Sequence, residues 1–342
     1  MVRLKEHYRK AIVFLILVFA LISVVMILTE ARTELEKTNG LFFAIAAFFF
    51  IASILIWLFS WALLIKKNTN LSFSKILTVG FSSVYGALTP VQLGAEALRS
   101  IQLKYYFKVS YQESISASMV VKGLKFLVLL IVSLIVISLF FSNVKLEPAI
   151  LLAFASGFAV VVLAVIVFLL PLKKSFGISI AAFFQSLSKF FRQFEGLSVF
   201  FKGYSEYLEK TTIAALFLTL VLASISFAFE FSALYFAFAA ANIIASLKAL
   251  LVLMILVSIL ERTPLLPRGI GIVELVAFSF MSLPAFSDSL LSTAQIGAAI
   301  ITFDIVRLVI PTIASLAVLA LSSKKLEEEN LASTSRRKKA AA

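Results

Sequence analysis

The chain is dominated by apolar runs that are as long as a bilayer is thick. A helix needs roughly 20 apolar residues to cross a hydrocarbon core of about 30 Å. Because an α-helix satisfies its backbone hydrogen bonds internally, each such run is expected to cross as a helix. The sequence therefore predicts an all-α polytopic membrane protein with six spanning helices, at Ala11–Leu28, Leu41–Ile65, Ser114–Phe141, Ala149–Leu170, Ile213–Ala241 and about Ser292–Leu321.

Composition argues against a soluble globule. Of the 342 residues, 61% are hydrophobic and only 14% are charged, whereas soluble domains carry about 25% charged residues. No small-residue cleavage site follows the first apolar run, so we expect a spanning helix there rather than a cleaved signal peptide.

The residue types that metal sites and many hydrolases need are scarce. The chain has no cysteine and one histidine, which is His7 in the polar leader. Disulfides and thiolate sites are therefore excluded, and a zinc site or a histidine-dependent triad in the membrane body is not expected. The phosphate-binding loop GxxxxGK[ST] is also absent. We expect no metal, no cofactor and no direct use of ATP.

Two further apolar runs are too short to cross a bilayer. They are Ile76–Leu88 and Ala249–Leu260, and each leads into a Thr-Pro step that is followed by glycine and glutamate, in TPVQLGAE and TPLLPRGIGIVE. Proline ends a helix because it lacks the backbone donor. We therefore predict two re-entrant hairpins of half-helices, with hinge residues Pro90, Gly94, Pro264, Pro267, Gly269 and Gly271.

The distribution of basic residues orients the chain. Most of the 31 lysines and arginines fall on one side if both termini are cytoplasmic, as the positive-inside rule favours. The net charge of +13 is then explained by anionic lipids at the inner face of the cell membrane, and no nucleic-acid partner is expected. Lys66 and Lys108 both belong inside, so the first short segment enters and leaves by the same face.

The two halves of the chain follow the same plan with opposite orientation. Residues 11–141 and 149–321 each contain three spanning helices, with the broken segment between the second and the third. An inverted repeat with paired, interrupted short segments is typical of transporters, although two unrelated Pro/Gly turns would give a similar pattern. We expect one membrane domain, 1–321, with an amphipathic cytoplasmic loop at 171–210 and a charged cytoplasmic tail at 322–342.

Ionisable residues within the apolar body are the candidate site, because charges at membrane depth are costly and usually face a cavity or a partner. Glu96 and Arg99, like Asp304 and Arg307, are spaced i, i+3 and share a helix face. Either each pair neutralises itself, or the pairs line a path for a phosphate-bearing headgroup, for which arginine is the better ligand.

Other charged residues leave similar alternatives open. Glu230 has no basic residue within a turn, so it either pairs with Arg307, Lys122 or Lys125 or is protonated. Arg262 and Arg268 flank the second break, where the following helix offers free N–H groups to an anion, unless the break is an ordinary loop.

In the cytoplasmic loop, phenylalanines follow a helical spacing. Phe183, Phe190, Phe191 and Phe194 share one predicted face with Leu187, as in a helix that lies in the membrane interface. Simple anchoring is one interpretation of this face, and a role in lipid access is the other.

Two motifs resemble the lysylphosphatidylglycerol synthase transmembrane family over about Ala11–Leu321. They are TPVQLGAEALR, and LPRGIGIVELVAF followed by TFDIVRLVIP. In the second motif the family has a Pro-Gly-Gly-Leu-Gly-like turn before a glutamate, here Glu274, and this chain has Arg268 in place of the first of those glycines. Where the family often has a Glu-Arg pair, this chain has Val121 and Lys122.

The resemblance implies translocation of a lipid between leaflets, of the kind that the flippase domain of the multiple peptide resistance factor carries out on aminoacylated phosphatidylglycerol. The partners would be membrane lipids, either anionic or polyprenyl-linked. Only a charged tail follows Leu321, so we do not expect this chain to be an enzyme of lipid synthesis. The competing hypotheses are an intramembrane transferase acting on a polyprenyl-phosphate lipid and a non-catalytic membrane assembly factor.

Overall fold

A computed structural model describes residues 31–88, 94–140, 148–261, 270–282 and 292–322, and all regular secondary structure in these ranges is helical. The elements are α2 Gly40–Asn68, α3 Phe73–Ser82, the 3-10 turn η1 Val84–Leu88, α4 Gly94–Phe107, α5 Tyr111–Phe140, α6 Pro148–Leu169, η2 Leu170–Leu172, α7 Lys174–Ser188, η3 Arg192–Phe194, α8 Glu195–Lys210, α9 Ile213–Ala240, α10 Leu247–Leu260, α11 Ile272–Met281, α12 Thr293–Asp304 and the π-helical turn η5 Ile305–Val309.

Four helices in the described ranges are long and apolar enough to cross a membrane: Gly40–Asn68, Tyr111–Ser138, Ile213–Ala240 and Thr293–Ser322. A fifth is counted if Phe158–Leu172 and Lys174–Ser188, which are bent by 113° at their junction, form one broken span. The predicted first span, Ala11–Leu28, lies outside the described residues. The chain is thus an all-helical, multi-pass membrane protein with four to five candidate spans in its described part.

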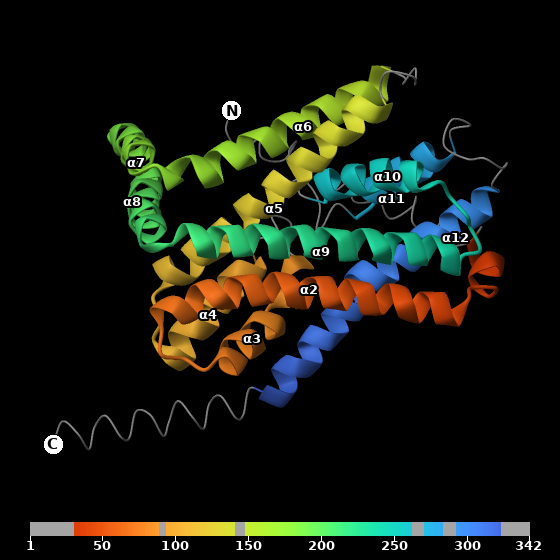
Figure 1. The fold of residues 1–342 in the computed structure, drawn as a ribbon, viewed down its shortest axis with the longest axis horizontal. Helices are drawn as coiled ribbons and strands as arrows, with labels where there is room; N and C mark the ends of the chain where they lie inside the picture. Colours follow the sequence, from red (N-terminus) through yellow and green to blue (C-terminus); the bar gives the residue numbers. More distant parts are fainter. Residues whose placement is uncertain (1–30, 89–93, 141–147, 262–269, 283–291, 323–342) are drawn as a thin grey trace, which may run out of the picture.

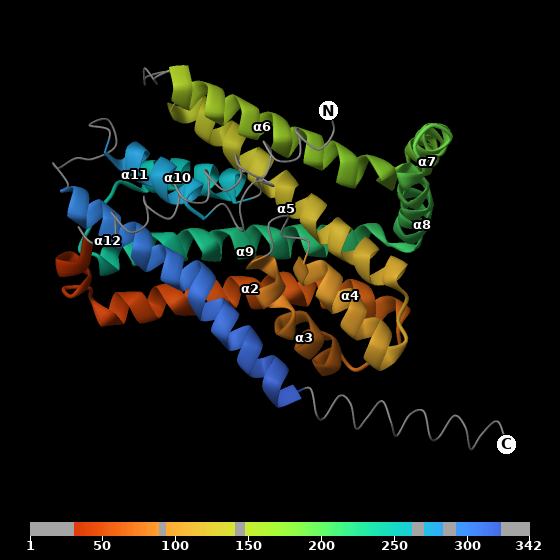
Figure 2. The same cartoon turned by 180° about the vertical axis from the view of Figure 1, so that it is seen from behind.

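Helices α2 and α9 form the central pair, lying side by side and antiparallel (Figure 1 and Figure 2). Small buried residues let their backbones approach, since the Ser226 hydroxyl donates to the Ser53 carbonyl across the pair at 3.1 Å. Farther along, the rings of Phe49 and Phe236 stack with centroids 5.5 Å apart. The Asn39 N–H also donates to the Ala240 carbonyl at 2.8 Å, so the start of α2 is fixed to the end of α9.

Each predicted short run overlaps a short helix, α3 or α10, and each of these is followed by a second short helix, α4 or α11. The pairs α3–α4 and α10–α11 lie toward opposite ends of the molecule. α3 and α4 lie at the end that carries α7 and α8, whereas α10 and α11 lie toward the other end (Figure 1). The ammonium group of Lys75, near the start of α3, is 5.7 Å from the ring centroid of Phe107, the last residue of α4. The chain therefore returns to the level from which it started.

The first run is not one helix over Ile76–Leu88, because α3 ends at Ser82 and the chain continues as the 3-10 turn η1. The Ser82 and Ser83 hydroxyls donate to the carbonyls of Val79 and Gly80, at 3.1 and 2.7 Å. Such local bonds compete with the helical ladder. A Cβ on Gly86, within η1, would lie 2.7 Å from the backbone carbon of Gly94, so η1 and the start of α4 pack too closely for a side chain at Gly86.

The loop at 171–210 is a helical hairpin of α7 and α8, and the prediction of one continuous phenylalanine face is wrong. α7 ends at Ser188, so Phe190 and Phe191 lie in the turn before α8. These two rings are 81% and 61% exposed. Phe194 instead stacks on Phe184 inside the hairpin, with centroids 5.9 Å apart, because folding back on α8 buries a different set of rings.

Gly271 precedes α11 with φ 90°, a conformation that side chains with a Cβ rarely adopt. We expect Gly271→Ala to destabilise the fold by about 1–3 kcal/mol, seen as a lower midpoint of thermal unfolding for the purified protein in detergent. Gly196→Ala is the matched control, since a Cβ at Gly196 meets no atom within 4 Å. Equal midpoints for the two variants would contradict the assignment of strain to Gly271.

Candidate functional site

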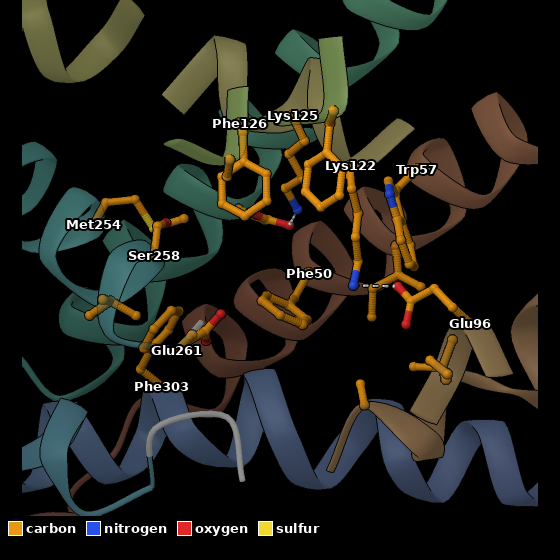
Figure 3. Close-up of a pocket in the computed structure, with 18 residues that line it drawn as sticks. Phe50, Trp57, Glu96, Lys122, Lys125, Phe126, Met254, Ser258, Glu261 and Phe303 are labelled. Atoms are coloured by element: carbon orange, nitrogen blue, oxygen red, sulfur yellow. Dashed lines mark hydrogen bonds and ion pairs between the residues drawn. The ribbon is translucent and has the colours of Figure 1, made fainter. Parts of the chain in front are cut away.

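A cavity of about 300 Å³ lies in the middle of the helical body. Residues from α2, η1, α4, α5, α6, α9, α10 and α12 line it, so both short-helix pairs contribute (Figure 3). Its apolar wall includes the aromatic side chains Phe50, Trp57, Phe126, Phe168 and Phe303. Its charged lining consists of Glu96, Lys122, Lys125, Glu230 and Glu261. This combination of aromatic and charged groups suits a ligand with a polar or charged end.

The first ion pair of the cavity joins Glu96 to Lys122. Glu96 lies in the first turn of α4, where the partial positive charge of the helix N-terminus favours a carboxylate. Its Oε1 lies 2.8 Å from Nζ of Lys122 on α5, and Figure 3 shows the two side chains pointing toward each other. The structure therefore gives Lys122 a partner, on a different helix.

Arg99 forms no ion pair with Glu96, so self-neutralisation, which was one of the two alternatives for these residues, is wrong. The Arg99 side chain is fully buried, and its guanidinium carbon lies 4.6 Å from the Trp57 ring centroid and 5.0 Å from that of Trp61. Its Nε donates to the Ala95 carbonyl at 3.2 Å, and neither Nη1 nor Nη2 has a hydrogen-bond partner among the described residues. The carboxylate has turned toward Lys122 instead.

Glu230 of α9 pairs with Lys125 of α5, with Oε1 2.5 Å from Nζ. Lys125 was one of the three cations considered for it. Both side chains are largely buried, at 17% and 14% exposure, and both line the cavity. Because Lys122 and Lys125 are one turn apart on α5, this helix supplies cations to two different neighbouring helices.

The third charged group is centred on Arg307, which lies in the π-helical turn η5. The predicted pair with Asp304 is confirmed, with Nε 2.6 Å from Oδ1. Two more carboxylates join it, from Glu261 at 2.5 Å and Glu274 at 3.0 Å. The fully buried guanidinium thus connects the end of α10, the start of α11 and α12. A π-turn often marks a functional position.

The contact between Glu274 and Arg307 repeats the contact between Glu96 and Lys122. In both cases a glutamate in the first turn of the second short helix binds a cation on the long helix that follows. Glu274 also accepts a hydrogen bond from the backbone N–H of Gly271, so its carboxylate holds the start of α11 as well. The two halves therefore use one ionic contact at two corresponding places.

Six of the predicted residues lie outside the described ranges: Pro90, Arg262, Pro264, Pro267, Arg268 and Gly269. Glu261, Trp57 and Trp61 had no predicted role in the site, and Lys125 was predicted only as a possible partner of Glu230. A signal for Glu261 is present, since it is the acidic residue that directly follows the second short run.

Within the described ranges, no group of three or more His, Cys, Asp or Glu side chains is suited to hold a metal ion.

Comparison with known proteins agrees with the motifs and with the helical architecture. Neither the curated proteins nor the solved structures gave a significant match. One protein-family model, described as the lysylphosphatidylglycerol synthase TM region, matches residues 11–315. This range includes every charged group of the cavity and all but the last turns of the span Thr293–Ser322. The chain therefore belongs to the lysylphosphatidylglycerol synthase transmembrane family.

Proposed function

We propose that the protein is a lipid transporter that moves an anionic or modified lipid headgroup between membrane leaflets. The observation that carries this proposal is the charged cavity enclosed by helices of membrane-spanning length. Charged groups inside a membrane protein are expensive and usually mark a substrate or ion path. Membership of a family named for lipid chemistry supports a lipid as the substrate.

The lining of the cavity fits a headgroup better than a whole lipid. Ion pairs at Glu96–Lys122 and Lys125–Glu230 present both signs of charge, and the cavity of about 300 Å³ lies at the lower end of the range of ligand pockets. In this mechanism the headgroup exchanges its hydration shell for these charges while the acyl chains stay in lipid. These contacts would lower the free-energy barrier to moving a charged headgroup through hydrocarbon.

Alternating access follows from the two short-helix pairs. In the proposal, α3–α4 and α10–α11 are re-entrant hairpins of an inverted repeat, which enter from the cytoplasmic and outer faces, respectively. Each is held to the following long helix by one glutamate, through Glu96–Lys122 or Glu274–Arg307. Breaking one contact while keeping the other would open the cavity to one side only, as transporters with inverted repeats require. In this arrangement the protein lies in the cell membrane and both of its termini are cytoplasmic.

Cysteine labelling tests the arrangement of the hairpins. Single cysteines at Ser74 and Lys104, at the ends of α3 and α4, are expected to react with a membrane-impermeant maleimide only from the cytoplasmic side. Cysteines at Ile244 and Ser282, which flank α10 and α11, should react only from outside. All four positions are exposed in the structure, and the chain has no native cysteine. Reaction of Ser74 and Lys104 variants from opposite sides would contradict a re-entrant hairpin.

Translocation of a fluorescent anionic glycerophospholipid in proteoliposomes tests the function. Glu96→Gln removes the charge that Lys122 faces, and an unpaired buried charge costs about 3–5 kcal/mol. We expect the initial rate of translocation to fall at least about tenfold, which corresponds to a rise of about 1.4 kcal/mol in the activation free energy. Glu209→Gln is the control, because it breaks the exposed pair Lys174–Glu209, and exposed pairs contribute little.

The double variant Glu96→Gln/Lys122→Gln separates transport from folding. Without either charge, thermal stability should recover toward that of the wild type, whereas translocation should stay low. Wild-type translocation by this variant would make the pair purely structural. Mass spectrometry of the lipid after the assay tests the competing function of a transferase, because a covalently altered probe would indicate that activity. Intact, untransported lipid with every folded variant and with the wild type would favour an assembly factor.

A further inference from the structure

Arg99 is a fully buried arginine that leaves most of its hydrogen-bonding capacity unused. Nη1 and Nη2 each carry two N–H donors, and none of these has an acceptor in the structure. The faces of Trp57 and Trp61 attract the positive charge, but ring faces do not replace an acceptor in the plane of the guanidinium. Buried polar groups nearly always have partners, so this exception calls for one.

Two neighbouring polar side chains have partners other than Arg99. Glu96 lies one helical turn before Arg99, but its Oε1 is bound by Lys122 at 2.8 Å, and its buried Oε2 makes no hydrogen bond to Arg99 or to any other described residue. The Ser100 hydroxyl donates to the Glu96 carbonyl at 2.7 Å and is 2.9 Å from the Ser114 hydroxyl. Within the described residues, the guanidinium fork is therefore left without an acceptor at Nη1 and Nη2.

The open fork lies directly beside the cavity. Trp57 lines the cavity and also covers the guanidinium, with 4.6 Å between the guanidinium carbon and the ring centroid. Ala95 and Glu96, from the same turn of α4, line the cavity too. A ligand in the cavity would reach Nη1 and Nη2 past the Trp57 side chain, and Lys122 would supply a second positive charge in the same cavity.

We propose that Arg99 is the binding site for the phosphate group of a lipid headgroup, with Trp57 as the side chain that closes it when no ligand is bound. A guanidinium presents paired donors that match phosphate oxygens, and the faces of the two indoles hold its plane in place. This inference rests on the proposed transport of a lipid, and it specifies a phosphate-bearing substrate.

Intrinsic fluorescence tests the site without any label, because the chain has two tryptophans and both flank Arg99. The purified full chain in detergent is titrated with dihexanoyl phosphatidylglycerol, with inorganic phosphate and with uncharged dihexanoylglycerol. We expect a saturable change in tryptophan emission with the phospholipid and none with dihexanoylglycerol. A response to inorganic phosphate at the same concentrations would support the phosphate site and identify the free ion as a ligand.

Three variants connect the response to Arg99. Arg99→Gln should lose the response, and Arg99→Lys, which keeps the charge but not the paired donors, should bind at least about tenfold more weakly. Lys104→Gln removes an exposed charge from the same helix and should leave the titration unchanged. The wild-type titration needs no substitution, so the test holds even if the Arg99 variants fold poorly.

The absence of any saturable response in the wild type, or an unchanged response in folded Arg99→Gln, would overturn the phosphate site. Lipid translocation is measured separately in proteoliposomes. Translocation without a fluorescence response would contradict the phosphate site at Arg99 and support the proposed transport. A fluorescence response without translocation would contradict the proposed transport and support the phosphate site.

Discussion

The interaction on which the site depends is an ionic contact between a broken segment and the long helix that follows it. At membrane depth a lone charge is expensive, so a carboxylate there has to find a cation. Glu96 and Glu274 each lie in the first turn of a short helix, where the helix dipole also favours a negative charge. Lys122 and Arg307 complete the two contacts at 2.8 and 3.0 Å. Interrupted backbone can thus be fixed inside an apolar body.

The two contacts differ in burial and in the cation that makes them. The side chain of Lys122, which binds Glu96, is 19% exposed, whereas the side chain of Arg307 is fully buried and binds Asp304, Glu261 and Glu274. A planar guanidinium can serve several carboxylates at once, which a compact ammonium group does less well. The contact at Arg307 is therefore the less accessible to water of the two. In the proposed transport cycle, the Glu96–Lys122 contact would be the one that opens more readily.

Helix α5 has a special position among the long helices because it faces two charged partners at once. Lys122 binds α4 and Lys125 binds α9, one turn apart, and both lysines line the same cavity. The central pair of α2 and α9 supplies the opposite wall through Phe50, Trp57 and Glu230. A rotation of α5 would therefore change the electrostatics at both sides of the cavity together. In the proposed transport, a headgroup would exchange contacts between these two ion pairs.

The sequence by itself determined the helical, membrane-embedded character of the chain, since apolar run length and the rarity of charge depend on composition and not on packing. It also located the two broken segments through their Thr-Pro steps, and it predicted the Asp304–Arg307 pair, which is local. Spacing within one helix could not show that Glu96 turns away from Arg99 to Lys122, or that Glu261 and Glu274 join Arg307. Those contacts were decided by tertiary structure, because a long charged side chain chooses among partners that only helix packing brings within reach.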